Sequence, residues 1–211
     1  MPVPSKVWSV TGKIKLAPDQ CKDGTHGTRM SFLFGRPRTS DLQVAADRLH
    51  DSLVDFIRQP VFYTAHGVPD TFEGRFDLLV LHVALVIRRL RELGTEGQDL
   101  AQHLTETMFR RFDIALRELG VSDVAVPKRM KRLAEAFKGR TAAYDEALTA
   151  GDDMKLASAV SRNVLGIEAE SEELTRYIVA ADARTQTMTL SPFQQGAVPF
   201  PDPAFFVTRP L

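Results

Sequence analysis

Apolar residues recur at three- and four-residue intervals along most of the chain, from Ser40 onwards. This spacing is typical of one face of an α-helix, and no sustained strand alternation interrupts it. The pattern predicts four long helices and two short ones, at about 40–59, 70–93, 100–119, 127–148, 153–165 and 171–186. We therefore expect an all-α fold, a single bundle of about six helices with extended N- and C-terminal segments.

Residues that start and stop helices set the expected boundaries. Asp70, with Glu73 three residues later, matches a capping box at the start of the second helix. Gly94 and Gly120 are placed to end the second and third helices. Pro127 suits the first turn of the fourth helix, which Gly139 is expected to break.

Both ends of the chain differ from the helical body at 38–187. Residues 1–37 predict a poorly structured N-terminal extension. Residues 188–211 form a tail rich in proline and phenylalanine. The prolines disfavour a helix there, and the phenylalanines are too apolar for a freely solvated segment. We expect this tail to lie extended across the bundle, with contact to a partner as the alternative.

Composition excludes several classes of protein. The 211 residues suit one domain of average size, and 27 basic residues balance 27 acidic ones. A generic nucleic-acid binder would be basic overall. The single cysteine, Cys21, cannot form an internal disulfide and favours a reducing compartment. The most apolar run, Leu78–Ile87, is shorter than the roughly 20 residues of a membrane span. We expect a soluble, cytoplasmic protein.

The charge is nevertheless unevenly distributed. The segment "VPKRMKRLAEAFKGR" at 126–140 carries six basic residues against Glu135, whereas residues 145–182 are strongly acidic. One interpretation is a solvated helix face. The other is a basic patch facing RNA, an anionic membrane surface or an acidic protein.

Candidate chemistry concentrates in "RQPVFYTAHGVPDTFEGRFDLLVLH" at 58–82, yet no nucleophile motif or phosphate loop occurs in the chain. Single acid–histidine pairs such as His103 with Glu106 do not make a metal site, so we expect no metal and no cofactor. His82 interrupts an apolar helix. We expect a buried histidine bonded to a carbonyl or a side chain, with catalysis or haem ligation as the alternative. Asp77 and Arg75 favour a structural polar network over acid–base catalysis.

Two long segments carry a family resemblance. "QPVFYTAHGVPDTFEGRFDLLVLHVALVIRRLR" and "LRELGVSDVAVPKRMKRLAEAFKGRTAAYDEAL" resemble the ubiquinol–cytochrome c chaperone family, over about residues 40–165. The resemblance implies a non-enzymatic assembly factor of complex III that assists the biogenesis of cytochrome b. Mitochondrial relatives act with a small partner protein, at the ribosome and on newly made cytochrome b. "MSFLFGRPR" resembles how shorter members begin, so Met30 is the expected start.

These observations together predict a client-binding surface made by an aromatic loop, with Phe62 and Tyr63, and the adjoining apolar helix. Expected partners are newly made cytochrome b, the ribosome or an anionic membrane surface, and a small partner protein, without specific DNA binding. The expected location is cytoplasmic, with peripheral association with the inner membrane. The alternative function is an RNA- or membrane-surface-binding module that uses helix 128–140. The candidate partner-binding residues are Phe62, Tyr63, Val68, Asp70, Arg75, Asp77, His82, Lys128, Lys131, Arg132 and Arg140.

Overall fold

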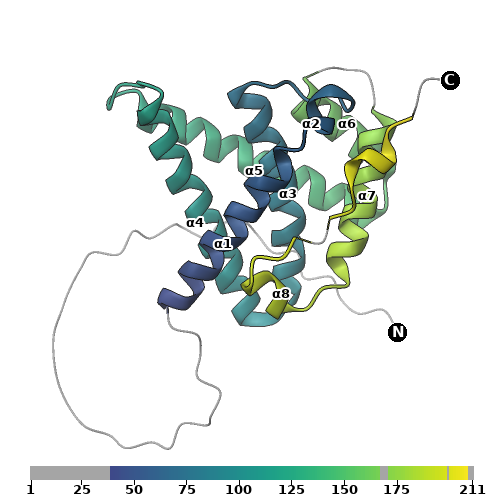
Figure 1. Cartoon of the computed structure of the whole chain (residues 1–211), viewed down its shortest axis with the longest axis horizontal. Coiled ribbons are helices and arrows are strands. Elements are labelled where there is room, and N and C mark those ends of the chain that lie inside the picture. Colours follow the sequence, from purple (N-terminus) through teal and green to yellow (C-terminus); the bar gives the residue numbers. More distant parts are fainter. Residues whose placement is uncertain (1–38, 167–170, 199, 209–211) are drawn as a thin grey trace, which may run out of the picture. The chain divides into compact units, whose positions relative to one another are not determined.

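The computed structural model describes residues 39–166, 171–198 and 200–208, which form an all-α fold without strands in these ranges (Figure 1). The all-α prediction is confirmed. The N-terminal extension, with Cys21 and Met30, lies outside the described residues. The helices are α1 (Thr39–Ile57), α2 (Pro60–Thr64), α3 (Phe72–Glu92), α4 (Gly94–Glu118), α5 (Val126–Ala150), α6 (Asp153–Val160), α7 (Glu172–Gln186) and α8 (Leu190–Gln194). A π-helical turn (Ser161–Leu165) follows α6, and a 3-10 turn (Pro203–Phe206) follows α8.

Helix α3 is the central element of the bundle. Its residues from Phe76 to Ile87 are all buried, and α1, α4, α5 and α7 pack around it. The apolar run recognised in the sequence therefore forms the core, as expected for a helix that is apolar on every side. No helix in the described part of the chain is long and apolar enough to cross a bilayer.

Three predicted boundaries are wrong. Helix α4 begins at Gly94, six residues before the expected start at 100. The N-cap of α3 is Thr71, whose Oγ1 accepts a hydrogen bond from the backbone N–H of Gly74 at 3.1 Å, so Asp70 does not cap the helix. Helix α5 continues unbroken through Gly139, which faces open space. One interior glycine costs about 1 kcal/mol, too little to interrupt a helix that packs against α3, α4 and α6.

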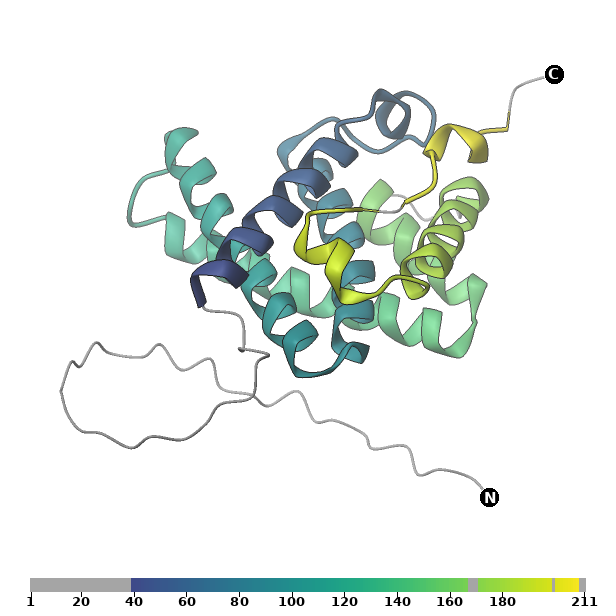
Figure 2. The same cartoon turned by 60° about the horizontal axis from the view of Figure 1, so that its bottom comes forward.

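The tail packs on the bundle, as the sequence predicted, but it is not extended throughout. Phe193 and Phe200 are buried, and the tail runs across the bundle from α8 to the 3-10 turn (Figure 2). Helix α8 forms in spite of Pro192, because the N–H groups of the first turn of a helix have no intrahelical partner and a proline there loses nothing.

Candidate functional site

The segment between α1 and α3 is compact. The prediction of an aromatic loop there is wrong in part. Residues 60–64 form helix α2, and the side chain of Phe62 is completely buried. The backbone N–H of Val68 donates to the carbonyl of Phe62 at 3.0 Å, and Val68 is buried as well. The exposed ring that the sequence predicted at Phe62 is therefore absent from this conformation, and Phe62 supports the segment from inside.

Next to Phe62 lies a buried cluster centred on His82, which we call the His82 cluster. His82 is fully buried, with Nδ1 at 2.8 Å from the carbonyl oxygen of Leu78 and Nε2 at 2.7 Å from the hydroxyl of Tyr177. A carbonyl only accepts, so Nδ1 donates to Leu78 and Nε2 accepts from Tyr177. Burial lowers the pKa of His82 from 6.5 to about 4, which keeps the ring neutral. The prediction of a bonded, buried histidine is confirmed.

Aromatic rings from four other elements enclose His82. Their centroids lie between 5.0 and 5.7 Å from that of the imidazole. The rings belong to Phe56, Phe62, Tyr177 and Phe200. Since both ring nitrogens are bonded and the ring is sealed from solvent, His82 has no free position for a substrate or a haem iron in this conformation.

The tail is fastened over this cluster by polar contacts. The buried ring of His66 donates from Nε2 to the carbonyl oxygen of Pro203, 3.0 Å away. The backbone N–H of Thr208 donates to a carboxylate oxygen of Glu173 at 2.6 Å. The α2–α3 connection, α7 and the tail therefore form one continuous surface above the cluster.

The accessible part of the α2–α3 segment is a small group that we call the Tyr63 surface, made of Tyr63, Asp70 and Arg75. Tyr63 is half-buried and donates its hydroxyl to the carbonyl of Ile57 at 2.8 Å. The guanidinium of Arg75 lies 5.6 Å from the centre of the Tyr63 ring, and its Nε donates to Asp70 at 2.7 Å. These contacts hold the aromatic ring in one orientation at the molecular surface.

A glycine allows this surface to pack against the start of α3. A Cβ added at Gly74 would lie 2.0 Å from the carbonyl oxygen of Pro69, which no side chain tolerates. The backbone of Pro69 can therefore approach the first turn of α3 only because residue 74 has no side chain.

Asp77 and Arg140 form a separate ion pair between α3 and α5. Arg140 lies 2.8 Å from the Asp77 carboxylate and 5.6 Å from the centre of the Phe76 ring. Burial outweighs this cation and raises the pKa of Asp77 from 3.8 to about 6. Asp77 thus belongs to a largely buried polar pair, as the sequence predicted, whereas Arg75 does not join it and pairs with the exposed Asp70.

Lys128, Lys131 and Arg132 lie elsewhere, exposed on the first two turns of α5. In the described chain, Lys131 approaches Glu135 at 3.9 Å, and none of the three has an ion pair with residues 60–82. The structure therefore divides the candidate residues into a buried cluster, the Tyr63 surface, an inter-helix ion pair and an exposed basic face.

Sequence reasoning missed the partners that complete the His82 cluster. Tyr177 is 95 residues from His82, and nothing in the sequence pattern joins the two positions. It also missed that Leu119 and Val124 are exposed in the turn between α4 and α5. Two apolar residues beside Gly120, Ser122 and Asp123 were the available signal.

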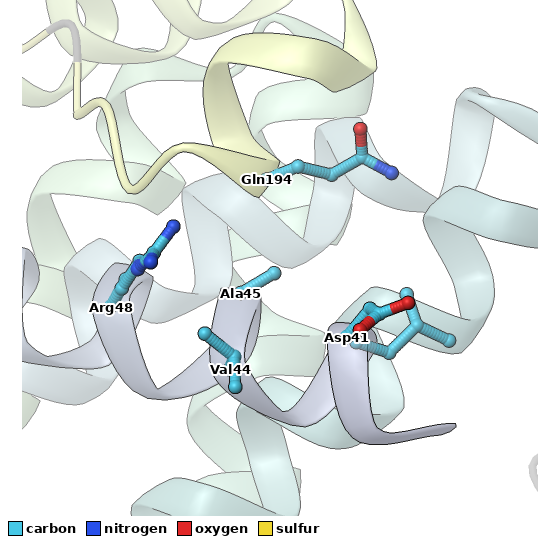
Figure 3. A pocket seen from close by; sticks show the side chains of 6 residues that line it. Asp41, Val44, Ala45, Arg48 and Gln194 are labelled. Carbon is cyan, nitrogen blue, oxygen red and sulfur yellow. The ribbon is translucent and has the colours of Figure 1, made fainter. Parts of the chain in front are cut away.

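The surface of the described part of the chain is hollowed at two places away from these residues. One, of about 430 Å³, lies between α1 and α8, where Gln194 faces the Arg48 and Asp41 side of α1 (Figure 3). The other, of about 660 Å³, lies along α6 and α7 beside Met154 and Val179. Neither hollow contains His82 or Asp77, so neither provides the enclosed pocket that an enzyme built on these two residues would need.

Comparison with known proteins gives one consistent family. The sequence model described as ubiquinol-cytochrome C chaperone matches residues 64–200. Ubiquinol-cytochrome-c reductase complex assembly factor 1 from Xenopus laevis is 25% identical over 138 residues, 65% of this chain and 68% of that protein. Its Drosophila melanogaster counterpart is 28% identical over 146 residues, 65% of this chain and 56% of that protein. The match thus spans about half to two thirds of these relatives.

A solved structure agrees with the sequence matches. The crystal structure of the Cbp3 homologue from Brucella abortus superposes with a TM-score of 0.70 at 32% identity, and covers 79% of this chain and 93% of that chain. The shared fold therefore extends over almost all of the related structure.

Proposed function

Because this chain belongs to the ubiquinol-cytochrome C chaperone family, we propose that it binds newly made cytochrome b and protects it until ubiquinol–cytochrome c reductase is assembled. The family relation supports an assembly chaperone, and the names of the relatives refer to the assembly of that complex. Cytochrome b as the client is our extension of this relation.

The observation that carries the proposal is the rigid, accessible Tyr63 surface. Its ring is fixed by the Ile57 carbonyl and by the Arg75 guanidinium, so little side-chain entropy would be lost when a client covers it. The tyrosine ring offers a large apolar area, and Arg75 and Asp70 place charged groups beside it. Such a surface suits an apolar client segment that has polar groups at its flanks.

The other candidate residues have supporting roles in this proposal. Phe62 and Val68 belong to the core against which Tyr63 packs, and the pair of Asp77 with Arg140 joins α3 to α5. We propose a non-enzymatic role, supported by the neutral, fully bonded ring of His82.

One experiment tests the chaperone function and the role of the Tyr63 surface separately. Cells depleted of the protein are complemented with the wild type, Tyr63→Ala or Tyr63→Phe, and complex III is followed on native gels together with the haem spectrum of cytochrome b. Co-purification of cytochrome b with each variant gives the binding. We expect Tyr63→Ala to lose most of the bound client and Tyr63→Phe to retain it, because the phenylalanine keeps the ring.

Two results would contradict the proposal in different ways. Normal complex III in depleted cells would overturn the function itself. Normal client binding by a folded Tyr63→Ala variant would be compatible with the chaperone function, but it would show that the Tyr63 surface does not bind the client.

A further inference from the structure

The end of α4 and the start of α5 form a hairpin that we call the arm, residues 113–132. In Figures 1 and 2 it stands at the edge of the helical unit, away from α7 and the tail. Ring contacts between Phe109 and Phe137, at 5.5 Å, and between Phe76 and Phe112, at 5.0 Å, mark its base. Further along the arm, Leu116 of α4 and Val126 of α5 are buried.

The tip of the arm has a defined backbone conformation. Gly120 has a φ of +77°, and the N–H groups of Gly120 and Val121 donate to the carbonyls of Arg117 and Leu116, each at 3.0 Å. This is the Schellman arrangement that ends a helix. Arg117 also bridges Asp113 in α4 and Asp123 in the turn. The turn is therefore held in place by the arm itself.

This ordered turn presents aliphatic side chains to solvent. Val124 is 90% exposed and Leu119 is 65% exposed. A single exposed aliphatic residue needs no explanation. Leu119 and Val124 lie together at the tip of one projecting hairpin, beside a basic helix face. They therefore form a surface that is both apolar and cationic.

Four cations lie next to the tip, on the first two turns of α5. Lys128, Arg129, Lys131 and Arg132 are all exposed, and in the described chain only Lys131 forms an ion pair, with Glu135 at 3.9 Å. Cations are unfavourable at the N-terminus of a helix, where the dipole is positive. Helices α3, α6 and α7 carry acidic residues in that position, whereas α5 carries none. An anion outside the helical unit would compensate this arrangement.

We propose that the arm docks on the surface of an anionic lipid bilayer, with Leu119 and Val124 among the headgroups and the α5 cations against the lipid phosphates. Aliphatic side chains beside a basic helix face are the combination that binds such an interface. Single-stranded RNA is bound by basic grooves with aromatic rings on which bases stack. At the arm the aromatic rings pack against one another at its base, so the tip offers aliphatic contacts instead. This inference goes beyond the proposed function and does not depend on the identity of the client.

The test is sedimentation of the full chain with vesicles of phosphatidylglycerol or of phosphatidylcholine alone. We expect binding to phosphatidylglycerol that weakens as salt is added, and little binding to phosphatidylcholine. Replacing Lys128, Lys131 and Arg132 with glutamine should lower the affinity on the order of 100-fold, because each cation near an anionic membrane contributes about fivefold. Replacing Leu119 and Val124 with serine should lower it roughly tenfold through the lost apolar contact.

Matched variants on other helices control for general effects. Arg91, Arg176 and Arg184 are exposed cations outside the arm, and their replacement with glutamine removes the same charge. Met154, 73% exposed on α6, controls for the loss of an exposed apolar side chain when it is replaced with serine. We expect these control variants to bind vesicles within about threefold of the wild type.

Three results would overturn the inference. They are absence of binding to phosphatidylglycerol vesicles, equal binding to both lipids, and equal losses in the arm and control variants. A fourth outcome is that the protein does not bind vesicles but binds an RNA hairpin through the α5 cations, and that Val124→Ser has no effect on this binding. That outcome would show that the basic face binds RNA instead of lipid.

Discussion

The His82 cluster and the arm differ in where their polar groups find partners. In the cluster, both ring nitrogens of His82 have partners, one in α3 and one in α7. In the arm, Lys128, Arg129 and Arg132 have no acidic partner in the described chain, and the nearby Val124 is exposed to solvent. Both regions combine apolar and ionisable residues in the sequence. Residue types alone therefore do not distinguish a structural cluster from an interaction surface, whereas the burial and hydrogen bonding of the side chains do.

The two regions also differ in the origin of their contacts. The cluster joins residues of α1, α2, α3, α7 and the tail, so its stability depends on the whole bundle. The arm is held mainly by the local bonds of Gly120, Val121 and Arg117. Substitutions in the cluster should therefore change folding, whereas substitutions of the exposed residues at the tip of the arm should change only what the arm binds.

The largest effect is expected for Phe62→Ala in the cluster. Removing this fully buried ring leaves a cavity among Phe56, His82 and Tyr177 and should lower the free energy of unfolding by about 3–5 kcal/mol. Urea unfolding followed by far-UV circular dichroism measures the change. A loss below about 1 kcal/mol would show that Phe62 is not part of the core.

A smaller loss is expected for Tyr177→Phe, which keeps the ring and removes only the hydroxyl. Nε2 of His82 would then be a buried acceptor without a donor, at a cost of about 1–3 kcal/mol. The same unfolding experiment tests it, with Tyr63→Phe as the control at a half-buried hydroxyl. If both variants lose equally little, the His82 bond adds no stability beyond ring packing.

A pH effect is expected for Asp77→Asn. Folding raises the pKa of Asp77 from 3.8 to about 6, so the folded state binds this proton more tightly and gains stability as the pH falls through that interval. Folding lowers the pKa of His82 from 6.5 to about 4, so stability is lost as the pH falls over nearly the same interval. The two effects oppose each other in the wild type.

Asp77→Asn removes the compensating group, and the variant should lose stability more steeply between pH 6 and 4 than the wild type does. Urea midpoints at several pH values in this interval, for both proteins, give the two slopes. A slope in the variant that is equal to or shallower than that of the wild type would contradict the assignment.

The smallest effect on folding is expected for Val124→Ser at the arm. The side chain is 90% exposed, so the free energy of unfolding should change by less than about 0.5 kcal/mol. A thermal melt beside the vesicle experiment checks this point. A large loss of stability would mean that the tip packs against something within the protein and that the arm is not a free surface.

The sequence predicted the helices well because long apolar periods report directly on burial. The two short helices appear as α6 with its π-helical turn and as α7, and the turn at Gly120 is in place. The prediction at Asp70 is wrong because Thr71 stands beside it and both residue types cap helices. Local signals of this kind determine a boundary only to within a residue or two.

The candidate site was less predictable because it depends on distant contacts. His82 was expected to be bonded, but Tyr177 as its partner follows only from the packing of α7 against α3. Phe62 lies between prolines and glycines, which favoured an exposed loop. The rings of Phe56, His82 and Tyr177 enclose it instead, and the short helix α2 that carries it has no strong periodic pattern.

The contact of the tail with the beginning of the bundle also bears on the order of folding. His66 and Pro203 are 137 residues apart, and Phe200 meets Phe56 of α1. Contacts between such distant positions form slowly, because a long stretch of chain must be ordered before they close. Until the tail arrives, the rings of Phe56 and His82 lack their contact with Phe200. Partly folded molecules would associate with one another through these rings. The packing of the tail on its own bundle therefore opposes self-association during folding.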